Sequence, residues 1–165
     1  MKHEHITVGE GTKYPLKGLL TLPDLAEHPV PAVVFVHGSG SSNMDEKVGK
    51  LTPFRDLAEG LVHHGIASVR YDKRSFAHGF KMLRDKKSVI TVKEETIEDA
   101  ILATELLRQD PRIDPEKIFK DSRRFINLGS KIAYHTEPEN VVQVFGLRIQ
   151  FRFFNELSVN GFPWF

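Results

Sequence analysis

The sequence predicts an α/β fold with a mainly parallel sheet. Continuous apolar, β-branched segments alternate along the chain with amphipathic helical segments, a pattern typical of parallel sheets covered by helices. The clearest buried strand is AVVFV at 32–36, and the clearest helix is TPFRDLAEGLVHHG at 52–65. Shorter alternating segments precede them, which predicts antiparallel strands at the start of the sheet.

The N-terminal elements follow in order. His3–Val8 alternates and predicts a strand, and Lys17–Leu22 predicts its antiparallel partner. The strand AVVFV then runs directly into the glycine-rich segment HGSGSS. In the helix that follows, Thr52 is expected to cap the first turn, Pro53 suits that turn, and Gly65 is expected to end the helix.

The next elements continue the alternation. Ile66–Tyr71 predicts a buried strand, and a polar loop is expected from Asp72 to about Ile90. The segment TVKEETIEDAILATELLRQ at 91–109 predicts a helix that begins with a capping box. Its expected inner face consists of Ile97, Ala100, Ile101, Thr104 and Leu107. A further buried strand is expected to begin at Lys117-Ile118-Phe119.

The glycine-rich segment admits several interpretations. Dinucleotide binding needs a third glycine where Asn43 stands and a helix directly after the loop, whereas the helix begins only near Pro53. A phosphate loop would need Gly-Lys-Ser/Thr, which is missing here. An oxyanion hole needs small residues whose N–H groups face a developing negative oxygen, as His37 to Gly40 would allow. A tight turn with no chemical role remains open.

Several segments in order resemble the α/β-hydrolase superfamily, most closely its dienelactone-hydrolase and acyl-thioesterase-like branch. They are the strand ending in His-Gly, the helix PFRDLA, the strand end YDKR and the helix before IDPEKIF. The resemblance covers roughly residues 15–119. It implies a serine hydrolase of carboxylic esters or thioesters, with the N–H of Ser39, after His37 and Gly38, as an oxyanion donor. Gly40 is the neighbouring candidate.

The resemblance ends within the last strand. The family places a G-x-S-x-G turn there, because only very small residues fit two positions before and after the serine. Ser122 instead has Lys120 and Arg124 at those positions, and no other serine in the chain fits the pattern. After Phe119 the only histidine is His135, which we interpret as an ordinary surface residue. We therefore expect no catalytic nucleophile and no esterase turnover.

The C-terminal segment 120–165 has a different composition. It contains 7 of the 12 Phe residues of the chain, and LRIQFRF at 147–153 alternates as a half-buried strand would. We predict a hydrolase-like N-terminal part at 1–119 and a non-family tail at 120–165. A shifted reading frame or a replaced segment would explain the change and would leave a truncated hydrolase. The alternative is a noncatalytic binding protein whose tail mediates self-association.

The remaining polar residues give no clear prediction of a functional site. Asp72, Lys73 and Arg74 follow a strand and would suit a substrate pocket, although a solvated loop with local ion pairing fits equally well. The charges at 45–47 are expected to be solvated. His3 and His5 share a strand face, but nothing nearby in the sequence completes a metal site. We expect no metal and no cofactor.

Charge and composition limit the partners. The net charge is +1, from 23 basic and 22 acidic side chains, so nothing in it favours nucleic acid or an anionic membrane as a partner. No cysteine is present, which excludes disulfides and thiol chemistry. The first ten residues lack a signal-peptide core and no apolar run reaches the ~20 residues of a membrane span, so a cytoplasmic protein is expected. A small acyl ester is the expected ligand.

Overall fold

A computed structural model gives the backbone of residues 1–24, 27–38, 40–85, 91, 93–121, 126–128, 131–133, 141–144 and 147–150. Side chains are described over the same ranges as far as Lys120, with the exception of Glu95. All structural statements below refer to these residues.

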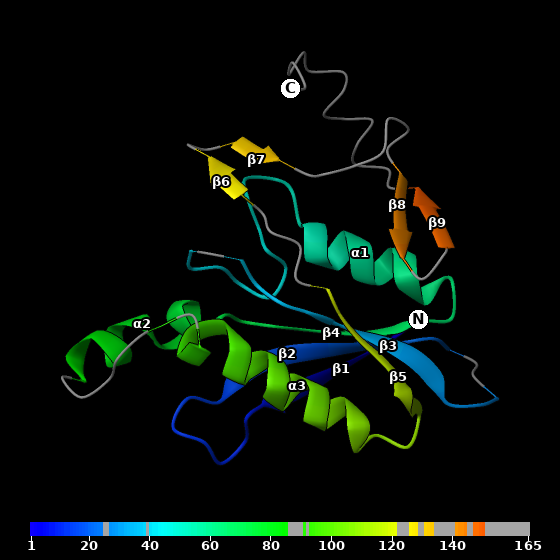
Figure 1. The fold of residues 1–165 in the computed structure, drawn as a ribbon, viewed down its shortest axis with the longest axis horizontal. Helices are drawn as coiled ribbons and strands as arrows, with labels where there is room; N and C mark the ends of the chain where they lie inside the picture. The colour runs from blue at the N-terminus through cyan, green and yellow to red at the C-terminus, as the bar shows by residue number, and fades with distance from the viewer. Residues whose placement is uncertain are drawn as a thin grey trace.

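A five-stranded sheet in the order β1-β2-β4-β3-β5 forms the centre of the molecule (Figure 1). Its strands are β1 (Lys2–Val8), β2 (Leu16–Leu22), β3 (Val30–Phe35), β4 (Ala67–Tyr71) and β5 (Ile113–Asp121). β2 pairs antiparallel with both β1 and β4, whereas β3 lies parallel between β4 and β5. The predicted antiparallel start followed by parallel strands is confirmed.

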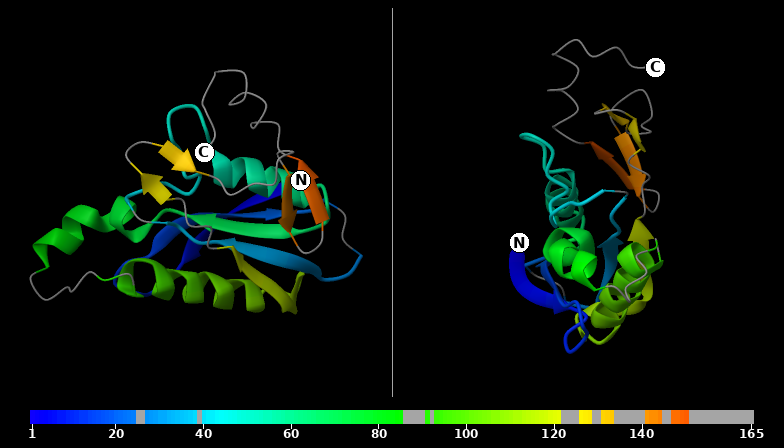
Figure 2. Two further views of the ribbon diagram at one scale, coloured as in Figure 1. Left: turned by 45° about the horizontal axis from the view of Figure 1, so that its top comes forward. Right: turned by 90° about the vertical axis from the view of Figure 1, so that its left-hand side faces the viewer.

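Helices cover both faces of this sheet. They are α1 (Pro53–Val62), α2 (Arg74–Arg84) and α3 (Glu98–Arg108), the last preceded by a π-helical turn at Lys93–Ile97. Helices α1 and α3 lie on opposite faces (Figures 1 and 2). Successive side chains of β3 therefore enter different layers. Phe35 stacks on Phe54 of α1 with ring centroids 5.1 Å apart, while Val34 joins the core cluster that contains Ala103 and Leu107 of α3.

The residues predicted to begin and end the helices are confirmed only in part. Helix α1 begins at Pro53, and Gly65 just beyond its end has a positive φ of 73°. The predicted Thr52 cap is wrong, because its hydroxyl lies 3.1 Å from the Asp56 carboxylate and makes no bond to the helix backbone. The capping box before α3 is confirmed in part, since the Thr91 N–H donates to the Glu94 carboxylate at 3.0 Å.

Two predicted features of the 72–109 region are wrong. The polar loop expected from Asp72 to about Ile90 contains helix α2, whose long apolar side chains mostly face outward. Local patterns missed it because its contacts are with the β1–β2 loop, far away in sequence. The face of α3 that packs on the sheet also differs from the face that the sequence predicts. Ile97 and Ile101 remain about half exposed, and Ala103 is buried instead, which brings the helix close to the sheet.

The last strand and the tail extend beyond the sequence-based expectation. β5 begins at Ile113, four residues before the expected start, and its pairing with β3 shifts between Val30 and Ala32. Two antiparallel pairs follow: β6 (Ile126–Leu128) with β7 (Lys131–Ala133), and β8 (Val141–Val144) with β9 (Leu147–Gln150). The strand predicted at 147–153 is confirmed for 147–150, and 151–153 lie outside the described residues. The division at 119 stays a prediction.

Candidate functional site at the carboxyl ends of the parallel strands

Two loops meet where β3 and β4 end. The glycine-rich loop follows β3 directly, and Asp72 to Arg74 follow β4. The two strands run parallel in register, with Ala32 opposite Ala67, so their carboxyl ends lie side by side. This edge of an open α/β sheet is where ligands usually bind. The residues on it are therefore the first candidates for chemistry.

His37 is buried at the start of the glycine-rich loop, with 5% of its surface exposed. Its Nε2 lies 2.5 Å from the backbone carbonyl oxygen of Tyr71, and its Nδ1 lies 2.6 Å from the Glu46 carboxylate. A carbonyl oxygen only accepts, so Nε2 carries a hydrogen and donates it to Tyr71. The Glu46 carboxylate engages Nδ1 on the other side of the ring. Because both ring nitrogens are engaged, His37 holds the loop in place and has no nitrogen left to act as a base.

Glu46 adopts an uncommon backbone conformation. Its φ is 52°, the one positive φ among the described residues other than glycine. Its N–H donates to the Asn43 carbonyl at 3.0 Å, and the next N–H, of Lys47, donates to the Asn43 side chain at 3.0 Å. A left-handed conformation at such a residue costs roughly 1 kcal/mol or more and persists only where the surroundings enforce it. The hydrogen bond of the Glu46 side chain to His37 and the turn at Asn43 hold the backbone of Glu46 in this conformation.

Lys73 is the second fixed point of the loop. Its side chain is 1% exposed, and Nζ donates to the carbonyl oxygens of Gly38 at 2.6 Å and Gly40 at 2.8 Å. Its backbone N–H also donates to the carbonyl of Ser42 at 3.1 Å. Gly40 has a φ of 97°, which a residue with a side chain rarely adopts. In a trans peptide the N–H points opposite the carbonyl, so the N–H of Ser41 points away from Lys73.

The neighbours of Lys73 also bind within the protein. The Asp72 carboxylate accepts a hydrogen bond from the Met44 N–H at 2.9 Å. Arg74 donates to Asp99 of α3 from two nitrogens, at 2.5 and 3.1 Å, and Asp99 is 1% exposed. Burial raises the pKa of the Asp99 carboxyl, and Arg74 acts in the opposite direction. These contacts tie the end of β4 to the glycine-rich loop on one side and to α3 on the other.

The expectation that the charges at 45–47 are solvated is wrong for Asp45 and Glu46. Asp45 lies 2.9 Å from Nε of Arg70, a side chain in β4 that is only 4% exposed. Glu46 contacts the buried His37, as described above. One signal in the sequence could have found these partners. Arg70 is the one charged residue of β4, whose residues are all buried, and a buried guanidinium requires an acidic partner.

The structure thus brings several predicted site residues together. Gly38 and Gly40 lie against Lys73, His37 precedes them in the same loop, and Asp72 accepts a hydrogen bond from Met44 just after that loop. Ser39, the predicted oxyanion donor, lies outside the described residues, as do Ser122 and His135. The assignment of a substrate pocket to Asp72, Lys73 and Arg74 stays a prediction.

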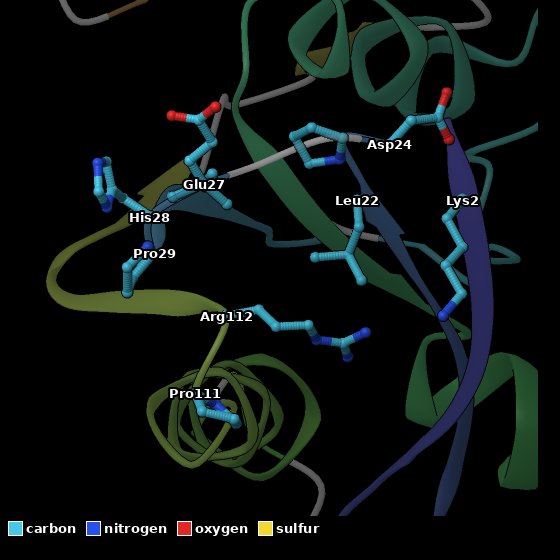
Figure 3. A pocket seen from close by; sticks show the side chains of 10 residues that line it. Lys2, Leu22, Asp24, Glu27, His28, Pro29, Pro111 and Arg112 are labelled. Atoms are coloured by element: carbon cyan, nitrogen blue, oxygen red, sulfur yellow. The ribbon is translucent and has the colours of Figure 1, made fainter.

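A cavity of about 360 Å³ lies at the opposite edge of the sheet, beside the amino end of β3 (Figure 3). Lys2 and Arg112 extend into it from different segments. Both cations are already paired with Glu4, Arg112 through two nitrogens at 2.8 Å. Arg112 holds the pKa of Glu4 down, at about 2. The cavity is thus bordered by a closed ion-pair network, far from the glycine-rich loop.

No metal cluster and no membrane span occur among the described residues. Nowhere in those ranges do three or more His, Asp or Glu side chains gather to hold a metal ion. His3 Nδ1 lies 3.1 Å from the hydroxyl of Thr21. Within the same ranges, no helix has the length and apolar character needed to cross a membrane.

Comparisons with known proteins agree with this architecture. The chain is 37% identical over 124 residues to esterase EstD of Thermotoga maritima, a match that covers 75% of this chain and 26% of that esterase. The α/β hydrolase GrgF from Penicillium sp. sh18 superposes with a TM-score of 0.51 at 17% identity, over 73% of this chain and 37% of GrgF. The N-terminal part of this chain belongs to the α/β-hydrolase superfamily.

The match to this superfamily is partial in length. The chain spans about a quarter of the length of esterase EstD. Dienelactone hydrolase from Anabaena variabilis aligns with a TM-score of 0.48 at 25% identity, over 73% of this chain and 52% of that enzyme. No family model matches the sequence. The superfamily membership therefore rests on the esterase relative and on the sheet order, and the activity of this chain is a separate question.

Proposed function

We propose that this chain carries the oxyanion half of a serine ester or thioester hydrolase and lacks a working nucleophile. The esterase relative supports the reaction class. The observation that carries the proposal is the contact of Lys73 with the carbonyl oxygens of Gly38 and Gly40. Fixing those carbonyls orients the peptide groups of the loop before any substrate arrives, which is the requirement of an oxyanion hole.

The oxyanion donors in this proposal are backbone N–H groups of the loop. The N–H of Ser39 is the donor that the family resemblance implies, and the N–H of Gly40 is the neighbouring candidate. The acyl oxygen of an ester would accept from them, and its charge would grow as the carbonyl carbon becomes tetrahedral. Donors that are already aligned are worth about 2.7–4 kcal/mol each in such sites. Lys73 acts as a positioning residue, because its ammonium group binds the loop and not the ester.

The missing nucleophile is argued from the end of β5. This strand reaches Asp121, opposite Phe35 at the end of β3, and the family places its nucleophile turn at the residue that follows in the sequence. That residue is Ser122, and its neighbours two positions away are Lys120 and Arg124. A nucleophile turn accepts only very small residues there. Ser122 is therefore expected to lack the strained, exposed geometry that activation requires.

Hydrolysis of p-nitrophenyl acetate and labelling by a fluorophosphonate probe test this proposal on the full chain. We expect neither saturable release of p-nitrophenol nor covalent labelling. Ser122→Ala is the matched control, since Ser122 is the first serine after β5 in the sequence and removing its hydroxyl should change nothing. Saturable turnover that disappears in Ser122→Ala would show that this serine is a nucleophile and that the proposal is wrong.

A binding experiment tests the oxyanion loop without requiring a nucleophile. A small acyl ester is the proposed ligand, and a phosphonate or boronate analogue of its tetrahedral intermediate would place a negative oxygen at the loop. Gly40→Ala forces a side chain into a φ of 97° and should weaken such binding. Gly79→Ala in α2 is the matched control, because that position has open space and no positive φ. Equal weak binding by all three proteins would contradict the oxyanion assignment.

A noncatalytic protein that associates through its tail is the second candidate. Two observations favour it. Segment 120–165 holds 7 of the 12 Phe residues, and Phe119 of β5 is 37% exposed. Exposed strands with apolar side chains promote association between chains. Sedimentation velocity of the full chain and of Phe162→Ser/Trp164→Ser tests this, and a monomer at every concentration in both proteins would exclude it.

A further inference from the structure

Helix α2 presents an apolar stripe to solvent. Phe76, Phe80 and Leu83 are 52%, 72% and 79% exposed, and the last two are the most exposed large apolar side chains of the described residues. Their spacing of i, i+4 and i+7 places all three on one side of the helix. We call these three residues the α2 stripe. Exposed apolar residues that stand alone are ordinary, but a continuous stripe on one helix is not.

The orientation of α2 is fixed by contacts on its other sides. Met82 is 3% exposed and faces inward. The His78 side chain lies 2.7 Å from the carbonyl oxygen of Pro15, and Lys81 Nζ donates to the carbonyl of Lys13 at 3.0 Å. Residues from the β1–β2 loop thus hold the helix along one flank. The helix cannot turn its stripe inward without breaking these bonds.

The exposed charges of α2 are positive and lie in its last turn, since Arg74 at its start is buried and paired with Asp99. The segment RSFAHGFKMLR at 74–84 contains two arginines, one lysine and one histidine, and no acidic residue. Arg84 is exposed, and its guanidinium lies 4.5 Å from the ring centroid of Phe80, beside the stripe. Lys81 is exposed on the neighbouring flank. The balanced charge of the full chain therefore conceals a local cationic and apolar surface.

This charge pattern limits what can cover the stripe. Two copies of α2 packed against each other would bring only positive side chains together, with no acidic partner on either helix. A surface that is both apolar and anionic would bury the α2 stripe and pair with the neighbouring positive side chains. A short helix with aromatic and aliphatic side chains on one side and Lys/Arg around them is typical of helices that lie in a lipid interface.

We propose that α2 docks this protein on an anionic lipid surface. The α2 stripe enters the boundary between head groups and acyl chains, while Arg84 extends to the lipid phosphates and Lys81, held at the Lys13 carbonyl, adds positive charge nearby. The helix has 11 residues, about half the length of a membrane span, so it lies along the surface. Helix α2 starts directly after Lys73, so docking would bring the glycine-rich loop near the lipid. The proposal does not depend on ester hydrolysis.

Vesicle flotation of the full chain tests the docking. The probe is phosphatidylcholine vesicles with and without about one third phosphatidylglycerol. We expect binding to the anionic vesicles, and a loss of about tenfold or more in Phe80→Ser/Leu83→Ser because its main apolar anchors are gone. Val48→Ser/Ile101→Ser is the control, since both are apolar residues with about half of their surface exposed, 47% and 48%, and lie outside α2. It should bind like the parent.

Charge variants complete the test. Lys81→Gln/Arg84→Gln should weaken binding to the anionic vesicles and reduce its dependence on salt. Melting curves of all variants should lie close to that of the parent, because these side chains are on the surface and Lys81 alone gives up a hydrogen bond, to the Lys13 carbonyl. Several results would overturn the proposal: no binding to anionic vesicles, equal binding to neutral ones, or unchanged binding by Phe80→Ser/Leu83→Ser. A dimer of the parent that this variant abolishes would assign the stripe to a second copy instead.

Discussion

The ammonium group of Lys73 lies 2.8 Å from the carbonyl oxygen of Gly40, and the same group binds the carbonyl of Gly38. A residue that follows β4 therefore sets the shape of the loop that follows β3. With the contact between His37 and Tyr71, this makes the carboxyl ends of two neighbouring strands one hydrogen-bonded unit.

Replacing Lys73 with Met should destabilise the protein by about 2–4 kcal/mol, because buried carbonyl oxygens lose a charged donor. Urea unfolding measures this loss. Lys81→Met is the control, since Lys81 is exposed and donates to a single carbonyl, and its cost should stay below about 1 kcal/mol. Similar losses of unfolding free energy in the two variants would show that the bonds from Lys73 to the glycine-rich loop stabilise the protein no more than an exposed hydrogen bond does.

Two substitutions at Glu46 separate its side chain from its backbone. Glu46→Ala and Glu46→Gly both remove the partner of His37, but only glycine accepts the φ of 52° without strain. Glu46→Gly should therefore be more stable than Glu46→Ala by about 1 kcal/mol, in thermal or urea unfolding. If alanine is the more stable of the two, the backbone at this residue is not left-handed.

The stability contributed by Arg112 should depend on pH. Arg112 holds the pKa of Glu4 at about 2, below the value of about 4.3 in an unfolded chain. A lowered pKa means that the unfolded state binds the proton first, so this contribution is full above about pH 5 and is lost as the pH falls toward 2. The difference in unfolding free energy between the parent and Arg112→Gln should shrink over that range. NMR titration of the Glu4 carboxyl should show a higher pKa in the variant.

Two glycines should respond to alanine in opposite ways. A Cβ at Gly18 would lie 2.9 Å from the backbone carbonyl of Arg70, so Gly18→Ala must separate β2 from β4. We expect a loss of about 1–3 kcal/mol. Gly79 lies inside α2 with open space around it, and Gly79→Ala should add up to about 1 kcal/mol. A tolerated Gly18→Ala would contradict the close approach of the two strands.

Most of the sheet was predictable from the sequence. The apolar, β-branched segments at 32–36 and 66–71 and the amphipathic helix after Thr52 carry their own signals, because burial on two faces or on one stripe fixes the residue pattern. Helix α2 was not predictable in this way. Its apolar residues face outward, and the bonds that hold it come from Lys13 and Pro15, over 60 residues earlier.

The sequence by itself determined the layered α/β order, the glycine-rich loop after β3 and the bulky residues around Ser122. These are local properties, set by side-chain size, spacing and backbone freedom. Only the tertiary structure decided that Lys73, Glu46 and the carbonyl of Tyr71 converge on that loop. Their pairing depends on two parallel strands ending side by side, and strand order is set by packing across the whole sheet, not by any short stretch of residues.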